Sequence, residues 1–304
     1  AVLLSCTTLA GCGRHESDVV SAIARGRGAV ELAIENGGSV NPKGGSRRVP
    51  LLEAANAGDA EIVSLLLARG ARIGVSGEGG ATPLHLAARR GHHASVAILA
   101  AAMSTEQIDA VAGPRRRTAL HDAAASGSID AVSALLRAGA NPKKADSFGQ
   151  SPLHLLAVVD PVRAAAIARV LLQAGADPIA ADARGFSPLH AAAASDNVPL
   201  VRELAPRSQL EMKTPAGETA LDVALRHGRD RAGEVLLAAG AALERDDAWP
   251  PLHDAARMDA VERAANLMAL PADTRRRAHD KTALEIAVEH GSKRVEALLR
   301  ERAR

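Results

Sequence analysis

The sequence predicts an all-α solenoid of about nine stacked helix-turn-helix units with hairpin (finger) loops, and three observations support this fold class. A tetrapeptide of the form Thr-Pro-Leu-His recurs along the chain, a glycine follows nine residues after most starts, and a later apolar segment ends in Gly-Ala. The copies start at Val49, Thr82, Thr118, Ser151, Ser187, Thr219, Pro250 and Thr282. Consecutive starts differ by 33, 36, 33, 36, 32, 31 and 32 residues, and a period of this size indicates a repeat protein.

The rest of each unit fits two short helices. The first helix, which begins at the tetrapeptide, must stop at the glycine, because the chain there needs a positive φ that glycine adopts at little cost. A second helix follows, as in the apolar run 62–67. The segments 146–149 and 182–185 begin with Asp and end with Gly, which is typical of hairpin tips. The turn glycines are Gly58, Gly91, Gly127, Gly228 and Gly291.

Helices of this length need neighbours. A helix of about ten residues is marginal in water, because nucleation fixes several dihedral angles for one hydrogen bond. The small and apolar residues Leu84, Ala87 and Ala88 let adjacent helices approach closely, and Leu120 occupies the matching position of the next unit. We therefore expect Leu120 to be buried between first helices of neighbouring units.

The T-P-L-H-x-A pattern at a period near 33 residues resembles the ankyrin repeat. The resemblance implies a non-enzymatic, protein-binding fold whose finger positions vary and contact partners. It also implies that the histidine at the fourth tetrapeptide position bridges loops by hydrogen bonds. These histidines are His85, His121, His154, His190 and His253.

The repeat pattern sets the expected organisation of the chain. The array is expected to fill residues 17–304, with a degenerate first repeat at 17–48 and a capping repeat at 282–304, because terminal repeats have one uncovered face. Two copies are three residues longer, around 100–113 and 160–165, where Asp160-Pro161 replaces the turn glycine.

Residues 1–12 predict a lipoprotein-type signal segment, followed by a short linker at 13–16. The first 11 residues are uncharged and mostly apolar, which matches the length of a signal-peptide core. They end in Leu9-Ala10-Gly11-Cys12, which resembles the lipobox of bacterial lipoproteins. We expect acylation of Cys12 and attachment to a membrane by its lipid; Cys6 is a competing site, and a chance apolar leader on a cytosolic protein is the alternative.

The sequence offers no support for a catalytic or metal site. The fourth-position histidines recur once per repeat and lack a second ligand three or four residues away. Metalloprotease, nucleophile-elbow and phosphate-loop motifs are absent from the sequence. A net charge of +2 gives no general signal for a polyanion. We therefore expect no cofactor, no metal and no nucleic-acid partner.

The three aromatic residues that are not histidine all fall at or near predicted fingers. They are Phe148, Phe186 and Trp249. Aromatic side chains are enriched at binding hot spots, so their position predicts a partner-binding edge. The other predicted members of this edge are Arg184, Arg226 and Arg257. The alternative is that each ring only covers its own hairpin.

Basic clusters near the fingers predict a discontinuous basic edge, with solvated loop charge as the alternative. They are Arg47-Arg48, Arg115 to Arg117, Lys143-Lys144 and Arg275 to Arg277.

The combined prediction is a monomeric interaction module that binds a protein through its concave finger and inner-helix surface while it is tethered to the bacterial cell envelope, on the periplasmic side or the cell surface. The alternatives are a cytosolic or host-delivered binding protein, an envelope spacer, and an envelope enzyme with a site in a long inter-repeat loop.

Overall fold

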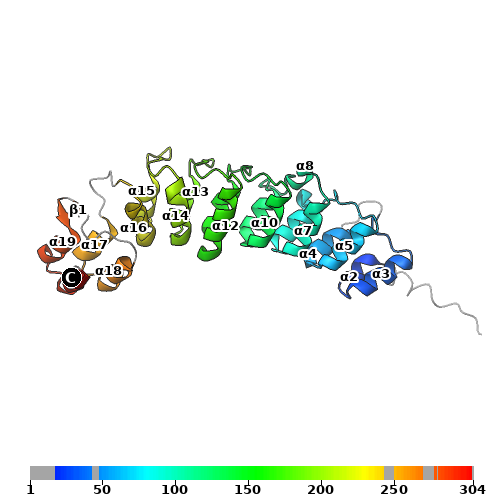
Figure 1. Cartoon of the computed structure of the whole chain (residues 1–304), viewed down its shortest axis with the longest axis horizontal. Helices are drawn as coiled ribbons and strands as arrows, with labels where there is room; N and C mark the ends of the chain where they lie inside the picture. Colours follow the sequence, from blue (N-terminus) through cyan, green and yellow to red (C-terminus); the bar gives the residue numbers. More distant parts are fainter. Residues whose placement is uncertain (1–17, 43–47, 243–249, 270–276, 279, 303–304) are drawn as a thin grey trace, which may run out of the picture. The chain divides into compact units, whose positions relative to one another are not determined.

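The structure is a computed structural model that describes residues 18–42, 48–242, 250–269, 277–278 and 280–302. The chain divides into unit 1, Ala1–Ser147, and unit 2, Phe148–Arg304. Each unit is a row of helix pairs with loops along one side (Figure 1). The predicted all-α solenoid is confirmed.

Unit 1 contains four helix pairs within the described residues. In each pair a first (inner) helix packs on the next inner helix, and a second (outer) helix packs on the next outer helix. The inner helices are α2 (Val19–Ile23), α4 (Pro50–Ala57), α6 (Pro83–Arg89) and α9 (Ala119–Ser126). The outer helices are α3 (Arg27–Glu35), α5 (Ala60–Ala68), α7 (His93–Ala101) and α10 (Ile129–Arg137). A 3-10 turn, η1 (Glu78–Gly80), forms the tip of one finger.

Unit 2 contains five helix pairs within the described residues. The inner helices are α11 (Pro152–Leu155) with η2 (Leu156–Val158), α13 (Pro188–Ala194), α15 (Ala220–Arg226), α17 (Pro251–Arg257) and α19 (Ala283–Glu289). The outer helices are α12 (Pro161–Gln173), α14 (Val198–Leu204) with η3 (Ala205–Arg207), α16 (Asp230–Ala238), α18 (Val261–Met268) and α20 (Lys293–Arg302). A short antiparallel pair, β1 (Arg277–Ala278) and β2 (Lys281–Thr282), precedes α19 with Arg277 opposite Thr282.

The additional residues of the two longer repeats form helix. In unit 1 they include α8 (Thr105–Ile108), which begins with a capping box between Ser104 and Gln107. In unit 2 the outer helix α12 is 13 residues long, and the Asp160 side chain accepts a hydrogen bond at its N-terminus. Proline at the first helical position and Asp before it are both favourable at a helix start.

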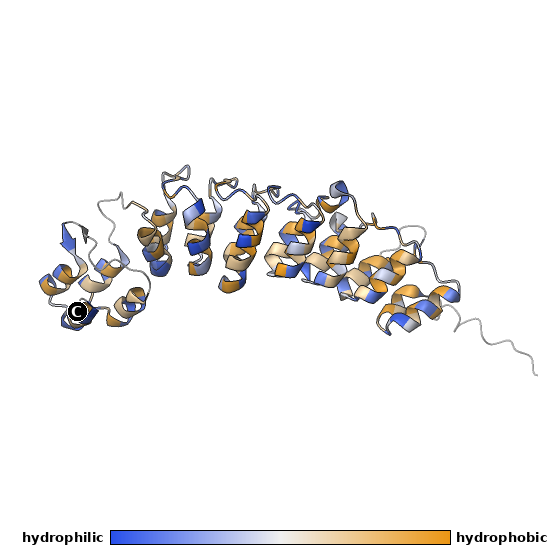
Figure 2. Cartoon of the chain, in the orientation of Figure 1, coloured by the Kyte–Doolittle hydropathy of each residue, from blue (hydrophilic) through white to orange (hydrophobic). Residues whose placement is uncertain are grey.

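The core lies between the helices of successive repeats. Leu84, Ala87 and Ala88 are fully buried, and Leu120 is 1% exposed, as expected. Figure 2 shows the hydrophobic residues concentrated on the helices of each unit and the hydrophilic ones frequent in the loops. Each repeat therefore hides its apolar face only when its neighbours are in place.

Neighbouring fingers are joined by backbone hydrogen bonds. In unit 1 the Gly113 N–H donates to the Gly79 carbonyl over 2.7 Å. In unit 2 the Ala183 N–H donates to the Phe148 carbonyl over 2.8 Å. The following finger has Pro215 at the position of Ala183, and proline has no N–H to donate. Pro215 instead packs so closely that a Cβ built on Gly185 would lie 2.3 Å from its Cδ.

Two turns between inner and outer helices use Asp where the pattern predicts glycine. Asp196 and Asp259 have φ angles of 55° and 51°. The Asp196 carboxylate accepts a hydrogen bond of 2.8 Å from Ala232 N–H, at the start of the next outer helix. Asp259 does the same for Val295 over 3.1 Å. At both turns, the residue with a positive φ therefore also carries the carboxylate that bonds to the next repeat.

Candidate functional site

The tetrapeptide histidines hold the fingers in place. Backbone N–H groups donate to the Nδ1 atoms of His154 and His190 over 3.1 and 3.3 Å, so Nδ1 is unprotonated and Nε2 carries the proton. The Nε2 atoms then donate to the carbonyls of Phe186 and Glu218, in the next finger, over 3.0 and 3.2 Å. In unit 1, His85 contacts the Arg117 carbonyl at 3.0 Å in the same way. The predicted loop-bridging role is confirmed for these three.

These histidines also have altered acidity. Burial lowers the pKa values of His85 and His190 below their ordinary value of 6.5. The neutral ring is the form that fits the hydrogen bonds on both sides. Within the part of the chain that the structure describes, no group of three or more His, Cys, Asp or Glu residues is arranged to hold a metal ion.

Phe148 and Arg184, two predicted members of the binding edge, lie on adjacent fingers of unit 2. Phe148 is 51% exposed, and its carbonyl accepts the hydrogen bond from Ala183 that joins the two fingers. A Cβ on Gly149 would lie 2.8 Å from the nitrogen of Ala183, so the two hairpins are in van der Waals contact. The exposed ring therefore stands on a well-supported backbone.

Arg184 is held on one side by a carboxylate and on the other by an aromatic ring. Its guanidinium donates to the Asp182 carboxylate over 3.1 and 3.2 Å, and lies 4.8 Å from the centre of the Phe186 ring. The same ring lies 5.6 Å from the His190 ring. The Arg184 side chain is still 66% exposed, so it presents donors to solvent in a fixed orientation.

Asp182 is the residue that organises this finger, and the prediction of the binding edge did not include it. Burial disfavours its charge, but hydrogen bonds from the backbone N–H groups of Phe186 and Arg184, and the Arg184 guanidinium, lower its pKa overall. The recurring Asp at the start of the finger was the available signal. Phe186 itself is half-buried between Arg184 and His190, so it covers its own hairpin.

The other predicted edge residues bond within their own repeats. Arg226, at the end of α15, pairs with Glu218 at 2.9 Å, and Arg257, at the end of α17, pairs with Asp254 at 2.8 Å. The structure does not bring Arg226 or Arg257 into contact with the Phe148–Arg184 pair. Trp249 lies outside the described residues, as does Cys12.

Some of the basic finger residues lie near buried or half-buried carboxylates. In unit 1, Arg117 pairs with Asp146 at 3.3 Å, and Lys144 Nζ lies 4.0 Å from the Asp109 carboxylate and donates to the Asp109 carbonyl at 3.0 Å. Arg47, Arg275 and Arg276 lie outside the described residues. These local pairs leave less charge for a general basic edge.

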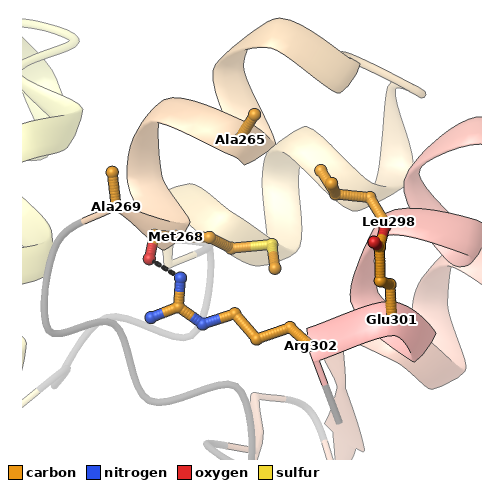
Figure 3. A pocket seen from close by; sticks show the side chains of 6 residues that line it. All are labelled: Ala265, Met268, Ala269, Leu298, Glu301 and Arg302. Atoms are coloured by element: carbon orange, nitrogen blue, oxygen red, sulfur yellow. Dashed lines mark hydrogen bonds between the residues drawn. The ribbon is translucent and has the colours of Figure 1, made fainter. Parts of the chain in front are cut away.

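One apolar pocket of about 290 Å³ lies between outer helices α18 and α20 of unit 2. Figure 3 shows Leu298 and Met268 beside it and the Arg302 side chain reaching across to the Met268 carbonyl. The pocket lies on the side away from the fingers. Within the described residues no helix is both long and apolar enough to cross a bilayer.

Comparison with known families agrees with the repeat geometry. A family model described as ankyrin repeats, in three copies, matches residues 20–112, 106–182 and 165–247. The chain belongs to the ankyrin-repeat family. A search of curated proteins found no match to the chain. Ankyrin repeats form a protein-interaction module, and the family is generally non-enzymatic.

Proposed function

We propose that this ankyrin array binds a protein partner through the surface that Phe148 and Arg184 form on adjacent fingers of unit 2. The supporting observation is an aromatic ring, 51% exposed, on the finger adjacent to one whose guanidinium Asp182 and Phe186 already orient. Little conformational entropy is lost when such fixed groups dock. Trp249, Arg226 and Arg257 extend this surface in the proposal.

A partner for this surface needs two features. It must offer an apolar side chain to the Phe148 ring and a carboxylate or carbonyl oxygen to the Arg184 guanidinium. Aromatic and arginine residues carry much of the binding energy at protein interfaces. Nε and Nη2 of Arg184 donate to the Asp182 carboxylate, so Nη1 would donate the hydrogen bond to the partner.

The test uses affinity capture from an envelope extract, followed by measurement of the affinity of the captured protein. Phe148→Ala and Arg184→Ala should each weaken binding by about thirtyfold, the effect of losing a hot-spot residue of about 2 kcal/mol. Val162→Ala removes an exposed apolar side chain, 74% exposed, from an outer helix and is the matched control. Equal affinity of both finger variants and wild type would refute the surface.

The proposed location is the bacterial cell envelope, with the array tethered by lipid on Cys12. The support is the apolar segment ending in Leu9-Ala10-Gly11-Cys12. Cys12→Ser should move the protein out of the membrane fraction, as judged by fractionation and intact mass. If only Cys6→Ser abolishes membrane association, Cys6 is the acylated residue. If the wild type and both variants are all found in the soluble fraction, the alternative of a cytosolic or host-delivered binding protein is favoured.

A further inference from the structure

One finger of unit 1 has an arginine where four other described fingers have glycine. The position lies two residues before the tetrapeptide, and the chain takes a positive φ there. Arg116 occupies it in the finger before α9, with a φ of 50°. Asp280 occupies it before α19 at 61°, and Asp is a residue type that adopts this conformation comparatively readily. The glycines have φ angles from 74° to 79° and are Gly80, Gly149, Gly185 and Gly217.

The left-handed backbone at Arg116 is unfavourable for the folded chain. In this conformation the Cβ of an L-residue lies too close to the following carbonyl oxygen, whereas glycine has no Cβ and avoids the contact. A residue persists in such a conformation only when the surrounding structure fixes it. Because glycine makes the same turn in the other fingers, the hairpin itself does not need an arginine at this position.

Neighbouring fingers fix the backbone of this hairpin on both sides. The Arg116 N–H donates to the Gly113 carbonyl over 3.0 Å across the turn. Gly113 N–H bonds to the carbonyl of Gly79 in the preceding finger, and Ser147 N–H, in the following one, donates to the Arg115 carbonyl over 2.8 Å. The tip is therefore held in place before a partner binds.

The three consecutive arginines of this finger differ in what their side chains contact. The Arg117 side chain is 20% exposed and lies 3.3 Å from the Asp146 carboxylate, which is fully buried. Arg115 also has a contact within the chain. Arg116 is exposed, and its side chain makes no hydrogen bond, ion pair or ring contact with any residue that the structure describes. Its positive charge is therefore available to a ligand.

We infer that Arg116 binds a carboxylate in an acidic segment of the protein partner. A guanidinium can donate two parallel hydrogen bonds to a carboxylate, and a side chain without an internal partner has these donors available. The neighbouring fingers already fix its backbone, so docking orders the side chain alone. The inference rests on the proposed protein-binding function and adds a contact in unit 1.

The pairing of the other arginines favours a protein carboxylate over a polyanion. Nucleic acids and anionic membrane surfaces are bound through several neighbouring cations. Arg117 is already paired with Asp146, and Arg115 has its own contact. Among the described residues of this finger, Arg116 is thus the arginine whose side chain is unpaired.

The first experiment selects phage-displayed random dodecapeptides on the immobilised full chain. Enriched peptides should share an Asp or Glu at a fixed position, and its replacement by Asn or Gln should weaken binding at least about tenfold. Arg116→Gln should cause the same loss. The two changes together should cause no further loss, because each removes the same contact.

Arg69→Gln is the matched control for the change in charge. Arg69 is an exposed residue at the C-terminal end of outer helix α5 in the same unit. Its replacement removes one positive charge, as Arg116→Gln does, and should leave the affinity for the selected peptides unchanged. An equal loss with both variants would show a general effect of net charge and would overturn the inference.

A second variant separates binding from folding. Arg116→Gly should bind the selected peptides as weakly as Arg116→Gln. Its urea midpoint should equal or exceed that of the wild type, because relief of the left-handed strain offsets the greater freedom of glycine in the unfolded chain. A lower midpoint would show that Arg116 supports the hairpin itself, and the inference would be wrong.

The same peptides distinguish Arg116 from the proposed surface of unit 2. Acidic peptides that are lost with Arg184→Ala but not with Arg116→Gln would overturn the inference and leave that surface standing. The reverse pattern would support Arg116 and count against the surface, and loss with both variants would support both. Enriched peptides without a shared acidic residue would overturn the inference, and failure to enrich any peptide would count against both.

Cosedimentation with phosphatidylglycerol vesicles tests the other class of partner. We expect the wild type and Arg116→Gln to sediment with these vesicles to the same extent. If Arg116→Gln abolishes cosedimentation but leaves peptide binding unchanged, the finger binds an anionic membrane surface and the inference is overturned.

Discussion

The inner helices α9 of unit 1 and α17 of unit 2 begin with similar tetrapeptides but are capped differently. At α9 the Thr118 N–H and hydroxyl both bond to Nδ1 of His121, over 3.2 and 2.8 Å, within one turn of the chain. At α17 the tetrapeptide starts with Pro250, which has neither an N–H nor a hydroxyl. There the Leu252 N–H donates to the buried carboxylate of Glu234, in outer helix α16, over 3.0 Å.

The difference separates a local cap from a distant one. A Thr cap stabilises its helix whether or not the preceding repeat is folded. The Glu234 contact exists only when α16 and α17 are packed together, so it couples two repeats. Similar short motifs therefore give one helix start that is independent and one that depends on its neighbour.

The largest loss of stability is expected when a core side chain near the local cap is truncated. Leu120→Ala should destabilise unit 1 by about 2–5 kcal/mol, because Leu120 is 1% exposed and its loss leaves a cavity. Urea unfolding followed by circular dichroism is the measurement. The loss should split the transition, since only neighbouring repeats share the damage. A near-neutral result would contradict the burial of this side chain.

The second largest loss of stability is expected when the distant cap is removed. Glu234→Ala should cost about 1–3 kcal/mol, because the Leu252 N–H loses its partner in a buried site. Glu234→Gln keeps an acceptor oxygen and should cost less. Combining Glu234→Ala with Pro250→Ser, which restores a capping hydroxyl, should recover part of the loss in urea melts. Strict additivity of the two changes would argue against a shared role at the start of α17.

Breaking the local cap should have a smaller effect. Thr118→Ala should cost about 1 kcal/mol, the usual value for a lost N-terminal cap. Ser133→Ala, a change of similar size in the outer helix α10, is the control. We expect Thr118→Ala to cost the same stability when Glu234 is also replaced, because the two caps lie in different units. Strong coupling in that double-mutant cycle would show that α9 is less independent than its hydrogen bonds indicate.

The smallest effect is the pH dependence of the histidine contacts. Burial lowers the pKa values of His85 and His190, so their contribution to stability is complete above 6.5 and is lost as pH falls through the folded values. The urea midpoint should therefore decrease between pH 7.5 and pH 5. His85→Gln/His190→Gln should reduce this slope. An unchanged midpoint over that range would be incompatible with neutral, hydrogen-bonded rings.

Carboxylates respond in a different pH range. Despite burial, hydrogen bonds from Arg257 and Arg263 lower the pKa of Asp254 below 3.8, and Asp182 is lowered by its own contacts. Their stabilisation is present above 3.8 and is lost only as pH falls below it. The histidine effect can thus be measured separately.

Local sequence determined much of the fold, because the tetrapeptide, the capping residue and the apolar spacing all act within one repeat. The contacts of His154 and His190 reach the next finger, and they were expected from the resemblance to the ankyrin repeat. The Asp196 and Glu234 contacts were not expected, because they also join different repeats and the donor is a backbone N–H without a sequence signal.

The candidate edge was predicted only in part. Phe148 and Arg184 could be placed together because the fingers follow the repeat period. Phe186 could be assigned to either role from sequence alone, and its contact with Arg184 depends on the shape of the hairpin. Arg226, at the end of an inner helix, pairs with Glu218, eight positions earlier in the finger that precedes this helix. This pairing depends on how the helix packs against its own finger.

Pro215 has a consequence for how the finger row of unit 2 moves. Phe148 and Arg184 lie on fingers that a directional hydrogen bond holds in register, whereas the contact of Pro215 with Gly185 is non-directional. A van der Waals contact resists separation but does not fix a direction. The finger at 214–218 therefore lacks the backbone hydrogen bond that joins the preceding two finger tips, and the bond from His190 to the Glu218 carbonyl is the directional contact that limits its sliding.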